Sequence, residues 1–262
     1  MVADNEFESL LGDIAKLSDS DQHDVWVPSL QKTVKFTSIT VKQQKELLSS
    51  GVTPRMKDVA FVNCINKIID TNCKEDVDIT TIDRPIVILQ LRSMSVSNNI
   101  TLYSGGNEFV VDIDKHVESK KQIQIPDEAR EFKVQTKSVA VECGAPSLSK
   151  DCILNDTFIE RVGTDTKVDL TKSIGDIYVF ELVKYIKTVS FNNEQLNVTV
   201  NFDDELTGDQ MLQVFEALPM DLCNKMVIQI EKLKNFEDLQ LTTDQIEPKS
   251  LIPIQADIFT GD

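Results

Sequence analysis

The chain has 262 residues, of which 41% are hydrophobic, so it can bury the core of one large domain or of two smaller ones. Its 43 acidic and 27 basic side chains give a net charge of -16, which repels phosphate backbones and anionic lipids and argues against nucleic-acid partners. No stretch approaches the roughly 18 uninterrupted apolar residues of a membrane span, so we expect no membrane insertion.

Residues 4–17 predict a short amphipathic helix, because their apolar side chains recur at the spacing of one helical face. This apolar stripe consists of Phe7, Leu10, Leu11, Ile14 and Leu17. The polar run that follows suits a flexible linker, so residues 1–24 are expected to form an acidic amphipathic segment with its linker. The stripe either docks on the core of its own chain or enters a groove on a partner protein.

A strand or hairpin and a helix are expected next. Residues 26–39 show the alternation of extended structure. Thr40 and Gln43 have the spacing of a capping box, which satisfies free backbone donors and starts a helix. Gly51 is placed to end that helix.

Two further helices complete a mainly helical part at residues 25–97. The first is predicted from about 56 to 69. The segment 83–96 is apolar nearly all round, so its periodicity fits a buried strand as well as a buried helix. Asp83 as a cap and Pro85 in the first turn favour the helix.

A small antiparallel β region is predicted at residues 98–145, inserted between helical parts. Two alternating runs, NITLY and EFVVDI, flank a turn at 104–107 that contains two glycines, which is typical of a hairpin. Alternation continues to about residue 143.

Residues 146–240 predict a helical part with one strand. Helices are expected at 151–162 and at 174–189, the second apolar on most faces and therefore central. The strand at 195–202 alternates most clearly. Together these elements define the α+β class, with helical segments around a small inserted antiparallel sheet.

Two helices and an extended tail are expected to end the chain. Thr207 and Gln210 form a second capping box for a helix that ends at Pro219, and another helix runs to about residue 236. Residues 241–262 contain two prolines and no helical period, which predicts an extended tail that becomes ordered when it is bound. Its apolar residues are further candidates for partner binding: Leu251, Ile252, Ile254, Ile258 and Phe259.

Few residues are suited to catalysis. The two histidines, His23 and His116, do not lie in segments that would hold a catalytic triad. The cysteines are Cys64, Cys73, Cys143, Cys152 and Cys223. Their odd number and wide spacing are typical of a reducing compartment, and the paired ligands of structural zinc lie only about two to four residues apart.

Acidic clusters occur at Asp112 and Asp114 and at residues 203–205. Paired carboxylates can transfer protons or hold a divalent metal, but only where they converge in a pocket. The second cluster precedes a helix, whose dipole gives a structural reason for its charge. We assign no catalytic, cofactor or metal residue, and a metal-dependent hydrolase that uses these clusters with Cys143 or Cys152 is the alternative from another class.

Three segments of the chain form a recognisable series: VPSLQKTVKFTSITVKQQKELL at 27–48, VNCINKIID at 62–70 and IDRPIVILQLRSMSVSNNITL at 82–102. Together they resemble the N-terminal pattern of the T4-type bacteriophage tail baseplate hub subunit family. The residues that carry the resemblance are Thr40, Lys42, Lys45, Glu46, Asn63, Cys64, Ile65, Asp83, Leu91 and Arg92. It covers roughly the first 100 residues, and beyond them it rests on general layout.

The resemblance implies a structural or assembly protein of a contractile phage tail, made in the host cytoplasm and acting in or on the baseplate hub. It implies no cofactor and no catalytic residues, and its partners would be other tail or baseplate hub proteins. We expect binding through sheet edges and terminal segments. Asp83 and Arg92 are expected to stabilise the fold. A dissociable chaperone for the tape-measure protein is the second hypothesis.

Overall fold

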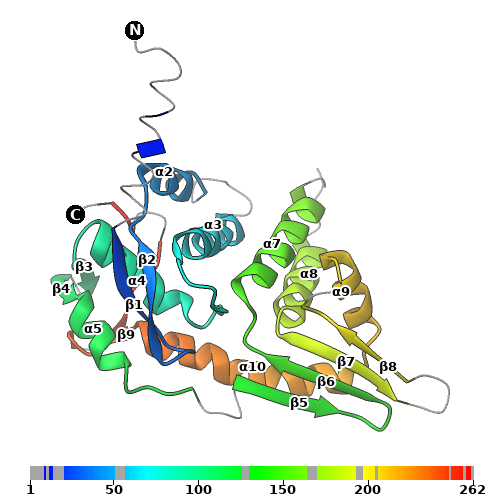
Figure 1. Ribbon diagram of the computed structural model, residues 1–262. Coiled ribbons are helices and arrows are strands. Elements are labelled where there is room, and N and C mark those ends of the chain that lie inside the picture. Colours follow the sequence, from blue (N-terminus) through cyan, green and yellow to red (C-terminus); the bar gives the residue numbers. More distant parts are fainter. Residues whose placement is uncertain are drawn as a thin grey trace.

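The computed structural model confirms the α+β class and shows two lobes that share the long helix α10, Met220–Leu241 (Figure 1). It describes residues 9, 12, 13, 21–50, 57–104, 106–125, 130–163, 170–192, 197–203, 206–247, 249–255 and 258–260. Each lobe has its own hydrophobic core. No helix among these residues has the length and apolar character needed to cross a membrane.

The first lobe is built on a hairpin that packs against a buried helix. Its elements are β1 (Gln22–Val27), β2 (Lys32–Thr37), α2 (Val41–Ser50), α3 (Lys57–Asn72), α4 (Arg84–Ser95), β3 (Asn99–Ser104), β4 (Asn107–Asp112) and α5 (Ile113–Lys120). Val25 lies opposite Val34 in the β1–β2 register, and both are fully buried. Gln90 of α4 holds the hairpin, because its side chain bonds both backbone groups of Trp26 at 2.8 and 2.9 Å.

The predicted side-chain cap is present at the start of α2 and absent at the start of α4. Thr40 and Gln43 form the expected capping box, with bonds of 2.8 and 3.2 Å. The helix predicted over 83–96 is also present, but Asp83 does not cap it with its side chain. The Asp83 carboxylate instead accepts hydrogen bonds from Thr80 and from Ser29, so it joins the β1–β2 turn to α4. Asp83 is fully buried, and its hydrogen bonds stabilise the fold, as expected.

The second lobe contains a four-stranded antiparallel sheet in the order β5-β6-β7-β8. Its elements are β5 (Glu131–Gln135), β6 (Val139–Gly144), α7 (Leu148–Gly163), α8 (Leu170–Val183), β7 (Ile186–Asn192), β8 (Asn197–Asn201) and α9 (Gly208–Glu216). Val134, Val141 and Val189 are neighbours across the sheet and are buried in the core. The opposite face is polar, as the bond of 3.0 Å between Lys133 and Glu142 shows.

The strands are divided differently from the sequence prediction. The predicted β region does not form one sheet, because β3 and β4 belong to the first lobe whereas β5 and β6 belong to the second. Helix α5 separates them, and Asp112 caps it by accepting a bond of 3.0 Å from the Lys115 backbone. The helix predicted over 174–189 ends at Val183, and the chain continues as β7. Residues 146–240 thus contribute two strands, because β7 finds partners on both sides.

The C-terminal tail is part of the first lobe and not a free segment awaiting a partner. β9 (Thr242–Thr243) pairs with β10 (Ser250–Leu251), after which the Ile252 backbone bonds Leu241 at 2.9 Å. Gln44 of α2 donates to the Phe259 carbonyl at 2.6 Å, so the end of the tail is held against α2. Figure 1 accordingly shows the described end of the tail within the first lobe.

Candidate interaction surfaces and the buried junction

The predicted N-terminal stripe lies outside the described residues. This applies to Phe7, Leu10, Leu11, Ile14 and Leu17, whereas Ser9, Gly12 and Asp13 between them are helical. The helix expected there agrees with these three residues. Partner binding by the stripe stays a prediction.

Most of the predicted C-terminal candidates serve the core of their own chain. Ile252, Ile258 and Phe259 are buried, and Ile254 packs partly against the same core. Leu251 is the exception, with 51% of its surface exposed. It lines a cavity of about 630 Å³ between the tail and strand β3. The tail therefore offers a partner much less apolar surface than its sequence suggests.

The histidine, cysteine and acidic residues considered for catalysis include side chains that are buried or paired within the fold. His116 is buried, its Nε2 lies 2.7 Å from the Gln240 carbonyl, and burial lowers the pKa of the imidazole. Burial raises the pKa of the Cys143 thiol to about 12, so the free thiol is protonated at neutral pH. Asp203 pairs with Lys150 at 2.6 Å. Within the described ranges, no three His, Cys, Asp or Glu side chains form a group that could hold a metal ion.

A buried charge network joins the two lobes. Asp151 of α7 has no exposed surface. Its carboxylate forms ion pairs with Lys184 and Arg84, each at 3.0 Å. Asn66 of α3 donates to the same carboxylate at 2.8 Å. Burial alone would raise the pKa of Asp151, but Lys184 and Arg84 outweigh it and hold that pKa below its ordinary value. Buried charges of this kind are stable only when they are paired, so the network fixes α3, α4, α7 and the end of α8 together.

Glu237 of α10 lies in the same charged environment, where Arg84 and Lys184 act on its carboxyl group. Burial raises the pKa of its carboxyl to about 7, against the opposing effects of Arg84, Lys184 and Lys234. No sequence motif marks Asp151 or Glu237. A lysine inside the apolar run FELVKYI was the available signal for the network, because an unpaired lysine is rarely buried.

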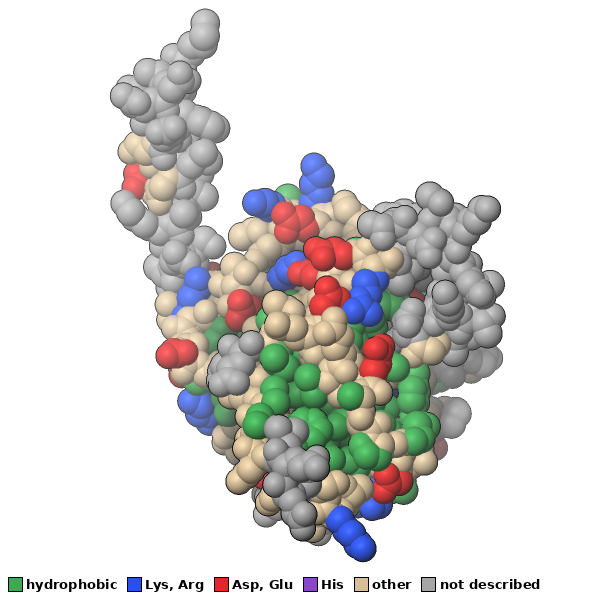
Figure 2. Space-filling view, turned by 90° about the vertical axis from the view of Figure 1, so that its right-hand side faces the viewer, with side chains coloured by type: hydrophobic (Ala, Val, Ile, Leu, Met, Phe, Trp, Pro, Cys, Tyr) green, Lys and Arg blue, Asp and Glu red, His purple; other side chains and the backbone are tan. Residues whose placement is uncertain are grey.

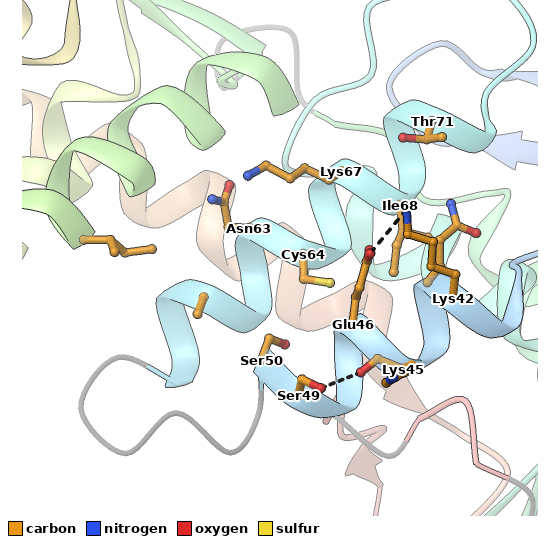
Figure 3. A pocket seen from close by; sticks show the side chains of 13 residues that line it. Lys42, Lys45, Glu46, Ser49, Ser50, Asn63, Cys64, Lys67, Ile68 and Thr71 are labelled. Atoms are coloured by element: carbon orange, nitrogen blue, oxygen red, sulfur yellow. Dashed lines mark hydrogen bonds and ion pairs between the residues drawn. The ribbon is translucent and has the colours of Figure 1, made fainter. Parts of the chain in front are cut away.

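A groove of about 720 Å³ separates α2 from α3. Figure 3 shows Cys64 of α3 between the two helices, with the lysines of α2 and Lys67 of α3 on opposite sides of it. Apolar or small side chains also line the groove, namely Ala60, Ile68 and Ile159. Acidic groups stand nearby, since Lys42 lies 4.0 Å from Glu46 and Lys67 lies 3.6 Å from Asp156. We call this region the α2–α3 groove.

A second surface is apolar and belongs to the sheet of the second lobe. Val200 lies opposite the fully buried Val189, so alternation places Val198 and Val200 on the core face of β8. Val198 is nevertheless 44% exposed. Figure 2, turned toward the second lobe, shows a broad apolar area with acidic and basic side chains gathered above it. We call the half-buried and exposed apolar residues of β8 and of its partner strand on this face the β8 surface: Phe191, Val198 and Val200.

The sequence profile of the T4 bacteriophage base plate protein family matches residues 22–244. The chain therefore belongs to that family, as the resemblance of its first hundred residues predicted. Membership gives it a general structural or assembly role in the tail baseplate of the phage particle. No curated relative and no solved structure matches the chain.

Proposed function

We propose that the chain is a structural subunit of the baseplate hub and binds neighbouring tail proteins through the β8 surface. The observation that carries the proposal is the exposure of Val198 on the core face of an edge strand. Side chains on this face normally belong to a core, and here the described part of the chain leaves them partly uncovered. A family whose members assemble into a baseplate supplies the partners that would cover them.

The position of β8 at the end of the sheet gives a second reason. In the order β5-β6-β7-β8, strand β8 pairs only with β7 among the strands that the structure describes. An edge strand presents unpaired backbone groups to which an extended segment of another protein can be added. Hydrogen bonds along the edge and apolar contacts beside it would then act together.

The charge of the chain is consistent with binding that depends on apolar burial. A net charge of -16 repels other acidic proteins at long range, so the contact itself must be apolar or must meet a basic partner. Each Å² of apolar surface removed from water contributes about 25 cal/mol. Val198, the most exposed member of the β8 surface, offers most of that gain.

The test is mass spectrometry of purified phage particles together with capture of the tagged full chain from infected cells. We expect the chain at a fixed stoichiometry in mature tails, with hub proteins recovered in the capture. Absence from mature particles, combined with recovery of the tape-measure protein, would replace the proposal with a dissociable chaperone.

A pair of matched variants tests the surface. Val198→Asp places a charge on the β8 surface, whereas Val110→Asp places the same charge at an exposed valine of β4 in the first lobe. We expect only Val198→Asp to lose its tail partners. Equal incorporation of both variants into particles would rule out the β8 surface as the binding site.

A further inference from the structure

The two edge strands of the sheet in the second lobe differ in charge. Figure 1 shows β5 and β8 at opposite ends of this sheet. β5 reads EFKVQ, and its Glu131 and Lys133 pair with Lys187 and Glu142 at 2.7 and 3.0 Å. Charged side chains on an edge strand oppose pairing with a strand of another chain. β8 reads NVTVN and carries no charge, so it is the edge that is suited to pairing.

The hydrogen-bond register shows which backbone groups of β8 point outward. The Phe202 N–H donates to the Lys187 carbonyl at 2.9 Å, so these residues form a hydrogen-bonded pair at the end of the ladder. Such pairs alternate with non-hydrogen-bonded pairs, which makes Thr199 opposite Ser190 a non-hydrogen-bonded pair. Their hydroxyl oxygens lie 2.9 Å apart, as expected of such a pair. Thr199 therefore directs its backbone N–H and carbonyl away from β7, toward the edge.

The sequence of β8 reads the same in both directions. Asn197 and Val198 precede Thr199, and Val200 and Asn201 follow it. A second β8 strand that lies antiparallel and is centred on Thr199 therefore places Val198 opposite Val200 of the second copy, on the core face of both sheets. Asn197 lies opposite Asn201 of the second copy on the other face. The strand is thus complementary to itself, as an interface with two-fold symmetry requires.

The exposure of β8 and the charge beside it favour this pairing. Val198 and Thr199 are exposed, and Val200 is half-buried, so a second copy would cover apolar side chains that are now in contact with water. Asp203, two residues beyond the strand, is paired with Lys150 at 2.6 Å. That ion pair lowers the repulsion between two acidic chains that meet along β8.

We propose that the β8 strands of two copies pair antiparallel about Thr199 and join their four-stranded sheets into one continuous sheet. Two backbone hydrogen bonds form between the two Thr199 residues, and Val198 of each copy packs against Val200 of the other. This inference rests on the proposed function, because it uses the same β8 surface and names a second copy of the chain as one of the hub neighbours.

Sedimentation of the purified full chain over a range of concentrations tests the pairing. We expect a concentration-dependent dimer, with self-association at least about tenfold weaker for Thr199→Pro. Proline at this position removes an outward N–H and no hydrogen bond to β7. A wild-type chain that is monomeric at every concentration would overturn the pairing.

Lys133→Pro is the matched control on the other edge. The Thr136 N–H donates to the Val139 carbonyl, so alternation gives Lys133 an outward N–H on β5 as well. We expect this variant to dimerise as the wild type does. Equal weakening by both prolines would overturn the assignment of the interface to β8.

Disulfide cross-linking tests the register. In the full chain with Cys64, Cys73 and Cys152 replaced by serine, Thr199→Cys should give a disulfide-linked dimer on mild oxidation. Opposite Cα atoms of a hydrogen-bonded pair lie about 5.5 Å apart, which a disulfide can span. Asn197→Cys is the control, because the two copies of this residue would be displaced by four positions, about 14 Å. Equal yields at the two positions would overturn the register.

The failure of this inference can be told from the failure of the proposed function. A chain that stays monomeric, and whose Val198→Asp variant still loses its tail partners, overturns the pairing and retains the β8 surface as the site for a different protein. A dimer that gives the Thr199→Cys cross-link but is absent from mature particles supports the pairing and overturns the hub subunit.

Discussion

The hydrophobic cores of the two lobes differ in how completely they are covered. The core of the first lobe is completed by the end of the chain, because Ile252 and Phe259 are buried in it with nearly no exposed surface. The core of the second lobe extends to β8, where Val198 is 44% exposed. An apolar terminal segment can thus close a core, whereas a regular strand can leave apolar side chains of a core face exposed.

Buried ion pairs join the two lobes, whereas the core of each lobe is apolar. Removing Asp151 leaves Lys184 and Arg84 buried without their partner, which should have the largest effect on stability. We expect Asp151→Ala to lower the free energy of unfolding by about 3–5 kcal/mol, measured by urea denaturation. Glu131→Ala is the control, since its pair with Lys187 is largely exposed and should contribute less than about 1 kcal/mol. Equal losses from both would mean that the junction does not hold the lobes together.

Closure of the first core by the tail should have the next largest effect. Phe259→Ala creates a cavity at a fully buried site, and we expect a loss of about 3 kcal/mol in the free energy of unfolding. Leu251→Ala is the matched change at a half-exposed position of the same tail and should cost less than about 1 kcal/mol. If Phe259→Ala lowers the free energy of unfolding as little as Leu251→Ala does, the tail does not close the core of the first lobe.

Glu237 makes the junction sensitive to pH. Its pKa is about 7 in the folded chain against 4.5 for an ordinary glutamate. Below pH 4.5 the carboxyl is protonated in both states, and as pH rises toward 7 only the unfolded state ionises freely, so stability falls across this window. Glu237→Gln should remove that fall and raise stability at pH 8 by about 2 kcal/mol, allowing for partial solvent access.

The check is denaturation of both proteins at several pH values between 4 and 8. Wild type and Glu237→Gln should agree closely at the acidic end and diverge toward neutral pH. Parallel curves for the two proteins would show that Glu237 is not the titrating group.

The smallest effect on stability is expected on the β8 surface. Val198→Asp should change the free energy of unfolding by less than about 1 kcal/mol, because its side chain is already partly in water. Thermal denaturation of this variant and of Val110→Asp provides the check. A loss of several kcal/mol would show that Val198 is a core residue, and its binding phenotype would then have to be attributed to misfolding.

Local chemistry was enough to predict many elements from the sequence. Thr40 with Gln43 and Thr207 with Gln210 form the expected capping boxes, because a box depends only on residues within one helical turn. The alternation at 195–202 likewise predicted β8. The family resemblance added the baseplate, which the profile match over 22–244 confirms.

Tertiary contacts decided what no local pattern contains. Residues 186–189 are apolar enough for a helix, yet they form β7 because β6 and β8 offer hydrogen bonds on both sides. Phe259 became a core residue because the tail returns to α2, 215 residues earlier in the chain. Asp151 gained its role from cations on two other elements. The sequence by itself determined the α+β class and most helix starts, whereas burial of the tail, the junction and the open edge at β8 depend on residues far apart in the chain.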